Sequence, residues 1–578
     1  MASLTAIALA ATGIPVAQSQ ETPPVTGKVF LDYGGDGEFT VGTDSPLGGI
    51  TVTAYDESGD SVGSTTTSVN DQGEGNYTLN TSVAEDAPLR IEFTDLPQGM
   101  NDSFNAGQSS VQFALAGASG IDFGVLDVNQ YNPIAAGAAG SDPTVGTAIL
   151  AAGRHDHVAA ADTEVLVATK WNVGQNVSGG NADFAARTTW ATYGEVGSIF
   201  SVAADTVSNR VFAGAAYKRI SDLGPEGLGG IYYVSNALDA AGTPQEGDTP
   251  RGFDVVADLG INVGQDLIAS RPALGEPNLL IPDVNAFENA MKVGIGGMAI
   301  DSQAQILYFV NLFDKRVYAI DISTVEEPRL IASIAAPTNA GQRAFALTLN
   351  QGQLYVGYND TGESEAWRSA EDAEMKYYVD RIDVLDRDAS SFTGSWSNVL
   401  NDGDLSYEKG SVTNNWGGSG NLPEFTEAYP QVSQWNSWTD TWIEQPDPPV
   451  ADWDAYVKEQ SRMGRTVGIF DDSRSWGHKT HVYPQPMLSG LAFDQEGYLT
   501  LAFADRTGFQ GGNRNWAAYE QPAQQHSVAD LWESLSSGDL LIAAPESEGG
   551  FQITQWTPES NGSAGDRTGT GQDNQGPG

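Results

Sequence analysis

The hydrophobic positions of this chain fall into short runs with the two-residue period of β-strands. Ile50, Val52 and Ala54 alternate with polar residues, which is the pattern of a strand with one buried face. Similar runs follow along much of the chain, and none of the stretches between them has the 3.6-residue period of a long amphipathic helix. The pattern predicts an all-β protein.

One arrangement recurs in the C-terminal part of the chain: an apolar strand, a turn at Asp or Asn, and a second strand. The Asp or Asn can close a tight turn by hydrogen bonding to its own backbone. The clearest copies are Gly197–Ala215, Gly296–Asp321, Arg343–Tyr358 and Ser489–Phe503. Their turns are separated by multiples of about 48 residues, a period typical of propeller blades. Residues 147–560 are therefore predicted to form a β-propeller of roughly six blades, with a β-sandwich or two stacked β-domains as the alternative.

An acidic, glycine-rich loop precedes the first alternating strand. It reads Phe30-Leu31-Asp32-Tyr33-Gly34-Gly35-Asp36-Gly37. Asp32 and Asp36 are spaced so that both carboxylates can turn toward one hard cation, and Gly37 supplies a sharp bend. The loop predicts a calcium site, with an acidic surface hairpin that holds no metal as the alternative.

The stretch from Gly27 to Leu79 resembles the B-type domain of serine–aspartate-repeat surface adhesins, over roughly residues 25–127. The family loop runs Phe-x-Asp-x-Asn-x-Asp-Gly-x-x-Asp-x-Gly-Glu, and this chain keeps Phe30, Asp32, Asp36, Gly37 and Gly42. The resemblance implies a calcium-binding immunoglobulin-like sandwich over residues 25–130, located outside the cell. It also implies that Asp44 replaces the family Glu, which is Thr43 here. Fewer carboxylates imply weaker calcium binding.

The repeated strands resemble the NHL/YVTN-like class of β-propellers, in which an apolar-Asp-Gly-apolar-Tyr-Val pattern marks each blade. Three longer strings are similar to a bacterial group that joins an adhesin B-like domain to a propeller: Leu223–Tyr232, Val310–Lys315 and Asp505–Arg514. The resemblance implies the order sandwich, then propeller, and names no chemistry.

The composition of the chain limits the partners that it can bind. The 578 residues include 28 Lys and Arg against 75 Asp and Glu, a formal net charge of −47. Such a charge disfavours binding to nucleic acid or to anionic lipid, because like charges repel. It suits a protein that is soluble in salty water, where salt screens the repulsion between acidic side chains. The chain has no cysteine, which excludes disulfides and thiolate chemistry.

The two ends of the chain differ from the rest in composition. Residues 1–20 hold an apolar run followed by small residues, as in a signal peptide, although a basic start is missing; a disordered tail is the alternative. The Ala/Gly/Pro-rich stretch Tyr131–Thr147 is predicted to be a linker, and residues 561–578 a disordered tail. No run reaches the roughly 20 apolar residues of a membrane span. The signal-like start and the adhesin resemblance predict secretion or display at the cell surface.

A tryptophan-rich insertion is predicted over residues 391–460. Trp435, Trp438 and Trp442 lie close together in it, and indole rings can stack on the apolar faces of sugars. We predict these three rings as the ligand-binding surface for an extracellular glycan or protein. The alternative is that the rings anchor the loop by packing.

Catalytic motifs are weak. His155, His157, His478 and His481 have no convincing metal spacing, no Gly-x-Ser-x-Gly elbow is present, and Asp301, Asp494 and Asp505 fit simple turns. The sequence therefore favours a calcium-stabilised scaffold or adhesin-type protein, with possible self-assembly, over an enzyme. An extracellular propeller hydrolase acting on glycans or esters is the alternative.

Overall fold

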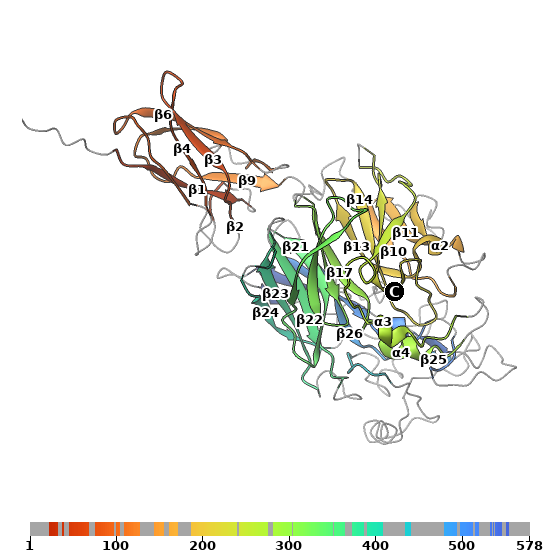
Figure 1. Cartoon of the computed structure of the whole chain (residues 1–578). Helices are drawn as coiled ribbons and strands as arrows, with labels where there is room; N and C mark the ends of the chain where they lie inside the picture. The colour runs from red at the N-terminus through yellow and green to blue at the C-terminus, as the bar shows by residue number, and fades with distance from the viewer. Residues whose placement is uncertain are drawn as a thin grey trace, which may run out of the picture. The chain divides into compact units, whose positions relative to one another are not determined.

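The computed structural model describes residues 22–32, 37–39, 45–68, 76–96, 100–103, 109–127, 144–154, 161–170, 187–239, 242–274, 281–302, 304–350, 352–363, 373–385, 390–392, 394–407, 434–440, 479–481, 483–493, 498–512, 515–518, 532–534, 536, 538–545 and 551–553. The chain divides into two compact units, Met1–Val128 and Asn129–Gly578. Figure 1 shows both units, with the chain coloured from its N-terminus to its C-terminus.

The first unit is made of two β-sheets. Its strands are β1 (Val25–Leu31), β2 (Ser45–Pro46), β3 (Thr51–Tyr55), β4 (Ser61–Thr66), β5 (Asn76–Leu79), β6 (Pro88–Thr94), β7 (Met100–Asp102), β8 (Val111–Leu115) and β9 (Phe123–Asp127). One sheet has the order β2-β1-β9-β7, with β5 also paired to β1, and the other has the order β4-β3-β6-β8. The first strand, β1, runs parallel to the last, β9.

One hydrophobic core lies between these two sheets. Val52, Ala54 and Ile91 from one sheet and Val29 and Phe123 from the other are fully buried in a single cluster. The alternation expected from the sequence around Ile50 is therefore present in β3, where buried and half-buried residues alternate.

The outer face of β8 departs from this pattern. Val111, Phe113 and Leu115 point away from the core, and Phe113 is 80% exposed. β8 is an edge strand that pairs with β6 alone among the described strands. Edge strands are commonly protected by charged residues, and β8 carries none.

The second unit contains a series of small antiparallel sheets. The first sheet holds β10 (Thr144–Ala148), β11 (Glu164–Lys170) and β12 (Thr188–Thr192), and the second holds β13 (Ile199–Asp205), β14 (Arg210–Ala215), β15 (Gly230–Ser235) and β16 (Arg251–Asp254). The third holds β17 (Ile295–Asp301), β18 (Ile306–Asn311), β19 (Arg316–Asp321) and β20 (Arg329–Ala335). The fourth holds β21 (Gln342–Asn350), β22 (Gln353–Asp360), β23 (Lys376–Asp383) and β24 (Ser397–Asp404). The last holds β26 (Pro486–Phe493), β27 (Leu499–Asp505), β29 (Asp539–Pro545) and β30 (Phe551–Ile553).

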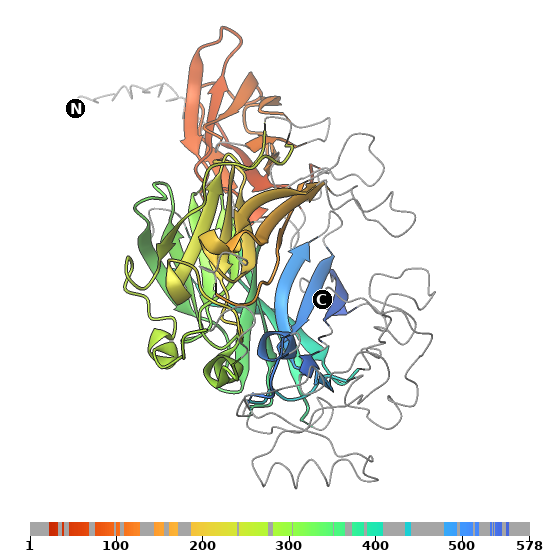
Figure 2. The ribbon, with the colours of Figure 1, turned by 90° about the vertical axis from the view of Figure 1, so that its right-hand side faces the viewer.

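Successive sheets pack against one another. β13 lies next to β17, β17 next to β21, and β21 next to β26. In Figure 2 the sheets follow in colour order from yellow through green to blue. Each neighbouring pair encloses its own hydrophobic cluster, and the central strands β14 and β18 are buried along their whole length. Strands covered on both faces need apolar residues on both faces, which explains their continuous apolar runs.

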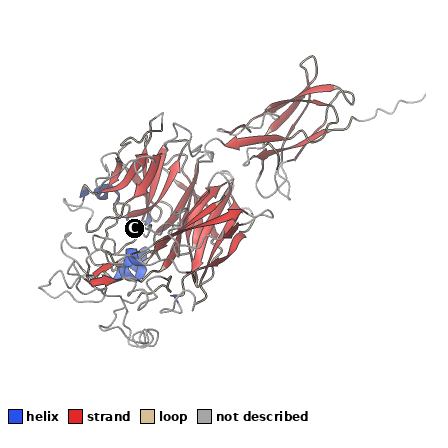
Figure 3. Cartoon of the chain, turned by 180° about the vertical axis from the view of Figure 1, so that it is seen from behind, coloured by secondary structure: helices blue, strands red, loops and turns tan. Residues whose placement is uncertain are grey.

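Helices are few and short in the described part of the chain (Figure 3). They are α2 (Tyr193–Val196), α3 (Gln265–Ile268), α4 (Val284–Asn289), α7 (Thr507–Gln510) and the 3₁₀ turn η3 (Gly227–Gly229). A two-stranded parallel pair, β25 (Lys479–His481) with β28 (Trp532–Ser534), completes the described elements. Within these residues no helix has the length and apolarity to cross a membrane.

The prediction of an all-β protein is confirmed, and several strands match to the residue. Ile306–Asn311 and Arg316–Asp321 are β18 and β19. The described residues of the second unit form five successive sheets, whereas the sequence predicts roughly six blades. The predicted start of the insertion at residue 391 is wrong, because β24 pairs with β23 and belongs to the fourth sheet. The polar Asn and Asp residues of β24 obscure the two-residue period of a strand. Such residues are expected in an outer strand of a sheet.

Candidate functional site

The predicted calcium loop is described only in part. Asp32 directly follows β1 and is fully buried. Its Oδ2 accepts a hydrogen bond from the Gly37 N–H at 2.6 Å and another from the Ser103 hydroxyl. Gly37 has φ 75°, which is the bend expected of this glycine. Asp36 and Asp44 lie outside the described residues, so calcium binding here stays a prediction.

No group of three or more His, Asp or Glu side chains suited to a metal occurs among the described residues. Asp32 is the one predicted ligand that is described, and its Oδ2 already serves two protein donors.

The predicted aromatic surface is wrong for two of its three rings. Trp435 is 0% exposed and Trp438 is 1% exposed. Trp435 Nε1 donates to the Tyr407 hydroxyl at 3.0 Å, and Trp438 Nε1 donates to the Pro486 carbonyl at 2.7 Å. These rings hold their segment against the sheets, because a large apolar ring gains more from burial than from stacking at the surface. Trp442 lies outside the described residues.

A partly buried charge network lies beside Trp438. The guanidinium of Arg506 lies 4.7 Å from the ring centre and donates to Asp440 Oδ1 at 2.9 Å. Lys292 bridges Asp440 and Glu363, and Arg343 also binds Glu363. Burial opposes ionisation of Glu363, but Arg343, Lys292 and Arg506 outweigh it and hold its pKa well below the usual range. Every charge in this network has a protein partner, so we assign it a role in holding the loops together.

Asp301 binds the backbone of its own turn, whereas Asp505 also binds a segment 20 positions away. Asp301 Oδ1 accepts from the Ala304 N–H at 2.9 Å, and Asp505 Oδ1 accepts from the Gln485 and Thr507 N–H groups. Asp494, His155, His157 and His478 lie outside the described residues. His481 is buried, with its Nδ1 3.3 Å from the Ser534 hydroxyl, and burial together with Arg219 lowers its pKa to about 3.

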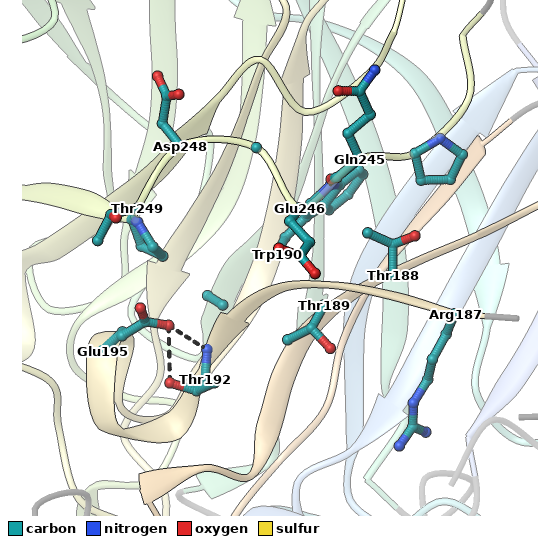
Figure 4. Close-up of a pocket in the computed structure, with 14 residues that line it drawn as sticks. Arg187, Thr188, Thr189, Trp190, Thr192, Glu195, Gln245, Glu246, Asp248 and Thr249 are labelled. Atoms are coloured by element: carbon teal, nitrogen blue, oxygen red, sulfur yellow. Dashed lines mark hydrogen bonds between the residues drawn. The ribbon is translucent and has the colours of Figure 1, made fainter. Parts of the chain in front are cut away.

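A polar pocket of about 600 Å³ lies beside β12 (Figure 4). One wall is β12 with Glu195 of α2, and the other is the segment 244–250, which connects β15 to β16. β12 pairs with β11 alone among the described strands. The pocket therefore runs beside a strand of the first sheet and a connection of the second.

Three hydrogen bonds fix the second wall and the residues just before it in place. Trp190 Nε1 donates to the Gln245 carbonyl at 2.8 Å, while Thr144 Oγ1 and Lys170 Nζ both donate to the Gly242 carbonyl, at 2.8 and 2.7 Å. Gly247 lies at φ 71°, where a Cβ would come within 2.6 Å of Val234. The wall is thus positioned by the first sheet and by a backbone shape that requires glycine.

Oxygen atoms dominate the lining. The pocket presents the hydroxyls of Thr188, Thr189, Thr192 and Thr249 and the carboxylates of Glu195, Glu246 and Asp248. Glu195 Oε2 accepts hydrogen bonds from the Thr192 N–H at 2.8 Å and from its hydroxyl at 2.9 Å, drawn as dashed lines in Figure 4. The guanidinium of Arg187, at the opposite side of the view, is ion-paired with Glu164. The pocket therefore offers many acceptors and suits a ligand rich in donors.

Sequence reasoning missed this pocket. Thr188–Thr192 is a run of strand-forming residues that resembles any other strand, and the segment 244–250 resembles an ordinary polar loop. The available signal was the concentration of Thr, Glu and Asp in the two segments. Their closeness in space depends on the packing of two sheets, which no local pattern records.

Comparison with known proteins adds little. No protein-family model matches the chain. It is 22% identical over 551 residues to Colossin-B of Dictyostelium discoideum, covering 94% of this chain and 12% of that protein. The chain thus spans about an eighth of that relative.

Solved structures show a similarly distant likeness. A protein from Lactobacillus plantarum aligns over 71% of this chain and 82% of its own, at 10% identity and a TM-score of 0.25. A putative 6-phosphogluconolactonase from Bacteroides fragilis aligns over 61% of this chain and 93% of its own, at 10% identity and a TM-score of 0.21. TM-scores this low say nothing about how this chain works.

Proposed function

We propose that the protein is a secreted or cell-surface binding scaffold, in which an immunoglobulin-like domain precedes a β-propeller. The core between the two sheets of the first unit supports the immunoglobulin-like domain. The second unit is a series of sheets with a separate core between each neighbouring pair. This arrangement supports the β-propeller. The charge of −47 and the signal-like start of the sequence fit an extracellular location.

The pocket beside β12 is the observation that carries a binding role. Its size lies within the range of small-ligand sites, and rigid strands hold its walls. Threonine hydroxyls and carboxylates bind the hydroxyl groups of sugars well, whereas three carboxylates repel sulfate and uronate groups. We therefore assign a neutral oligosaccharide segment as the ligand class.

Binding of the full chain to panels of neutral and sulfated oligosaccharides tests this function. We expect neutral members to bind and sulfated ones to fail. Glu246→Gln combined with Asp248→Asn should weaken binding by about tenfold or more, since each lost hydrogen bond to a charged group costs about 1.5–3 kcal/mol. Glu327→Gln, an exposed site on the third sheet, is the matched control. Absence of neutral binders, or an unchanged affinity in the double variant, contradicts the proposal. Cleavage of a bound glycan would favour the hydrolase instead.

Calcium forms the second part of the proposal. A metal held by the folded first unit and not by the unfolded chain stabilises that unit by about 2.7 kcal/mol at a hundredfold excess over Kd. Chelator should lower the melting temperature of the first unit in the full chain, and Asp36→Ala should remove the difference. Glu57→Ala, in an exposed turn of the same unit, should retain it. Identical melting with calcium and with chelator would contradict calcium binding.

A further inference from the structure

Lys218 is a largely buried cation whose amine has no acceptor among the described residues. It lies three residues after the end of β14 and is 8% exposed. No described residue accepts a hydrogen bond from its Nζ, whereas its backbone carbonyl accepts from Arg271 Nη2 at 3.1 Å. A largely buried ammonium group needs acceptors, because burial removes most of the water that would otherwise solvate it.

The neighbouring carboxylate is already in use. Asp283 Oδ1 accepts from Arg271 Nε at 3.0 Å, and its Oδ2 accepts from Arg271 Nη2 at 2.7 Å and from the Ile220 N–H at 2.6 Å. Arg219, the next residue, is directed elsewhere and donates to the carbonyls of Pro282 and Trp516. The three donors of the Lys218 amine therefore stay open while the donors around them are occupied.

The backbone beside Lys218 is strained. Ile220 has φ 54° and Asp283 has φ 46°, in the left-handed region. That conformation is a genuine outlier for a β-branched residue such as isoleucine. Strain of this kind persists where surrounding contacts enforce it and is concentrated at ligand sites. The Arg219 N–H, bound to the Phe509 carbonyl at 2.9 Å, ties this segment to the last sheet's connection.

We propose that Lys218 is the anchor of a second ligand site, which binds an oxyanion: the carboxylate or phosphate group of a small ligand. The site is separate from the pocket beside β12 and shares none of its lining residues. Arg219 and Arg271 add positive charge around the amine, and Asp283 positions Arg271 and the strained backbone. In a chain with a net charge of −47, these three neighbouring cations attract an anion that most of the surface would repel.

The protonation state favours binding over covalent chemistry. Burial, with Arg219 and Arg271, lowers the pKa of Lys218 to about 8, while Asp283 opposes the shift. At neutral pH the amine is therefore mostly charged, as an anion site requires. A bound anion would raise this pKa, because an opposite charge nearby favours the protonated form.

Amine labelling of the full chain tests the site. The protein is acetylated with an N-hydroxysuccinimide ester near pH 8, and the rate at each lysine is read by mass spectrometry. Inorganic phosphate, acetate or chloride is added at constant ionic strength. We expect phosphate or acetate to slow labelling of Lys218 by about tenfold at saturation, with chloride ineffective. The exposed Lys376 should react equally in all three salts.

Two variants complete the test. Lys218→Met should abolish the rise in melting temperature that the effective anion gives to the unaltered chain, and Lys376→Met should retain it. The phosphate and acetate arms show which oxyanion the site prefers. Equal labelling of Lys218 in all three salts, or a melting response that persists in Lys218→Met, would overturn the proposal. The labelling result decides the question even where Lys218→Met fails to fold.

Discussion

Charged side chains are unevenly placed between the surface and the interior of the second unit. The chain has few cations, yet Arg210, Arg219 and Arg506 are buried. Arg506 donates to the carbonyls of Ala290, Thr439 and Glu288 as well as to Asp440. A planar guanidinium can satisfy that many acceptors at fixed angles, and an ammonium group cannot.

Arg506→Lys should therefore be strongly destabilising. We expect a loss of about 3–5 kcal/mol in the free energy of unfolding, because several buried acceptors lose their donor. Arg329→Lys is the matched control: its side chain is 74% exposed and pairs with Asp321, so the change should stay within about 0.5 kcal/mol. Denaturant titration measures both, and equal losses would contradict this role for Arg506.

His481 makes the stability depend on pH. Its pKa is about 3 in the folded chain and 6.5 in the reference state, so the unfolded chain binds the extra proton between these values. The stabilisation is complete above pH 6.5 and is lost as the pH falls toward 3, by about 1.4 kcal/mol per pH unit. His481→Asn should reduce the slope of the unfolding free energy over this range, and Ser534→Ala should leave the slope unchanged. The same slope in His481→Asn would rule the residue out.

Sequence reasoning at the residue scale succeeded where chemistry is local. Gly37 has the bend expected of it, and Asp301 binds the backbone three residues on, both within a stretch that the sequence records directly. Trp435 and Trp438 show the opposite. Their segment has no period, so nothing in the sequence says whether a ring faces solvent or a sheet.

Strands were the most predictable elements. Runs such as β18 and β22 are apolar along their length because sheets cover both of their faces, and such runs are easily recognised. Outer strands were harder, as β24 shows: with one side open to solvent, its sequence Ser-Asn-Val-Leu-Asn-Asp-Gly-Asp resembles a loop.

Truncating a side chain on the inner face of the sheet that contains β8 should destabilise the protein more than truncating one on its outer face. Phe93 is 3% exposed and stacks on Phe123 with ring centres 4.6 Å apart, so Phe93→Ala should cost about 3–5 kcal/mol. Phe113 faces outward, and Phe113→Ala should change the unfolding free energy by no more than about 0.5 kcal/mol. Calorimetry of the full chain can compare them. A large loss in Phe113→Ala would mean that something covers this face in solution.

At the scale of the whole molecule, the two units have separate cores, which no described hydrophobic cluster shares. The pocket beside β12 and the surroundings of Lys218 both arise where connections of different sheets meet. Their positions follow from the order and packing of the sheets, which the repeat suggests only coarsely. This is why the strands could be predicted and the sites could not.

Separate cores imply separate unfolding. We expect two calorimetric transitions in the full chain, because each unit buries its own apolar surface. Phe93→Ala should lower the transition of the first unit and leave the other in place, while Arg506→Lys should do the reverse. A single transition that moves as a whole in both variants would contradict independent units.

The pairing of each sheet with its neighbour in sequence also bears on how the chain folds during synthesis. Each core cluster between sheets draws its residues mainly from two successive sheets, so a sheet can complete one face as soon as the following sheet leaves the ribosome. Such contacts join nearby parts of the chain, which keeps the entropy of loop closure low. The bonds from Arg219 to Trp516 and from Arg506 to Ala290 span 297 and 216 positions. They can form only after β27 and the segment that follows it have been made, and so they close the second unit late in synthesis.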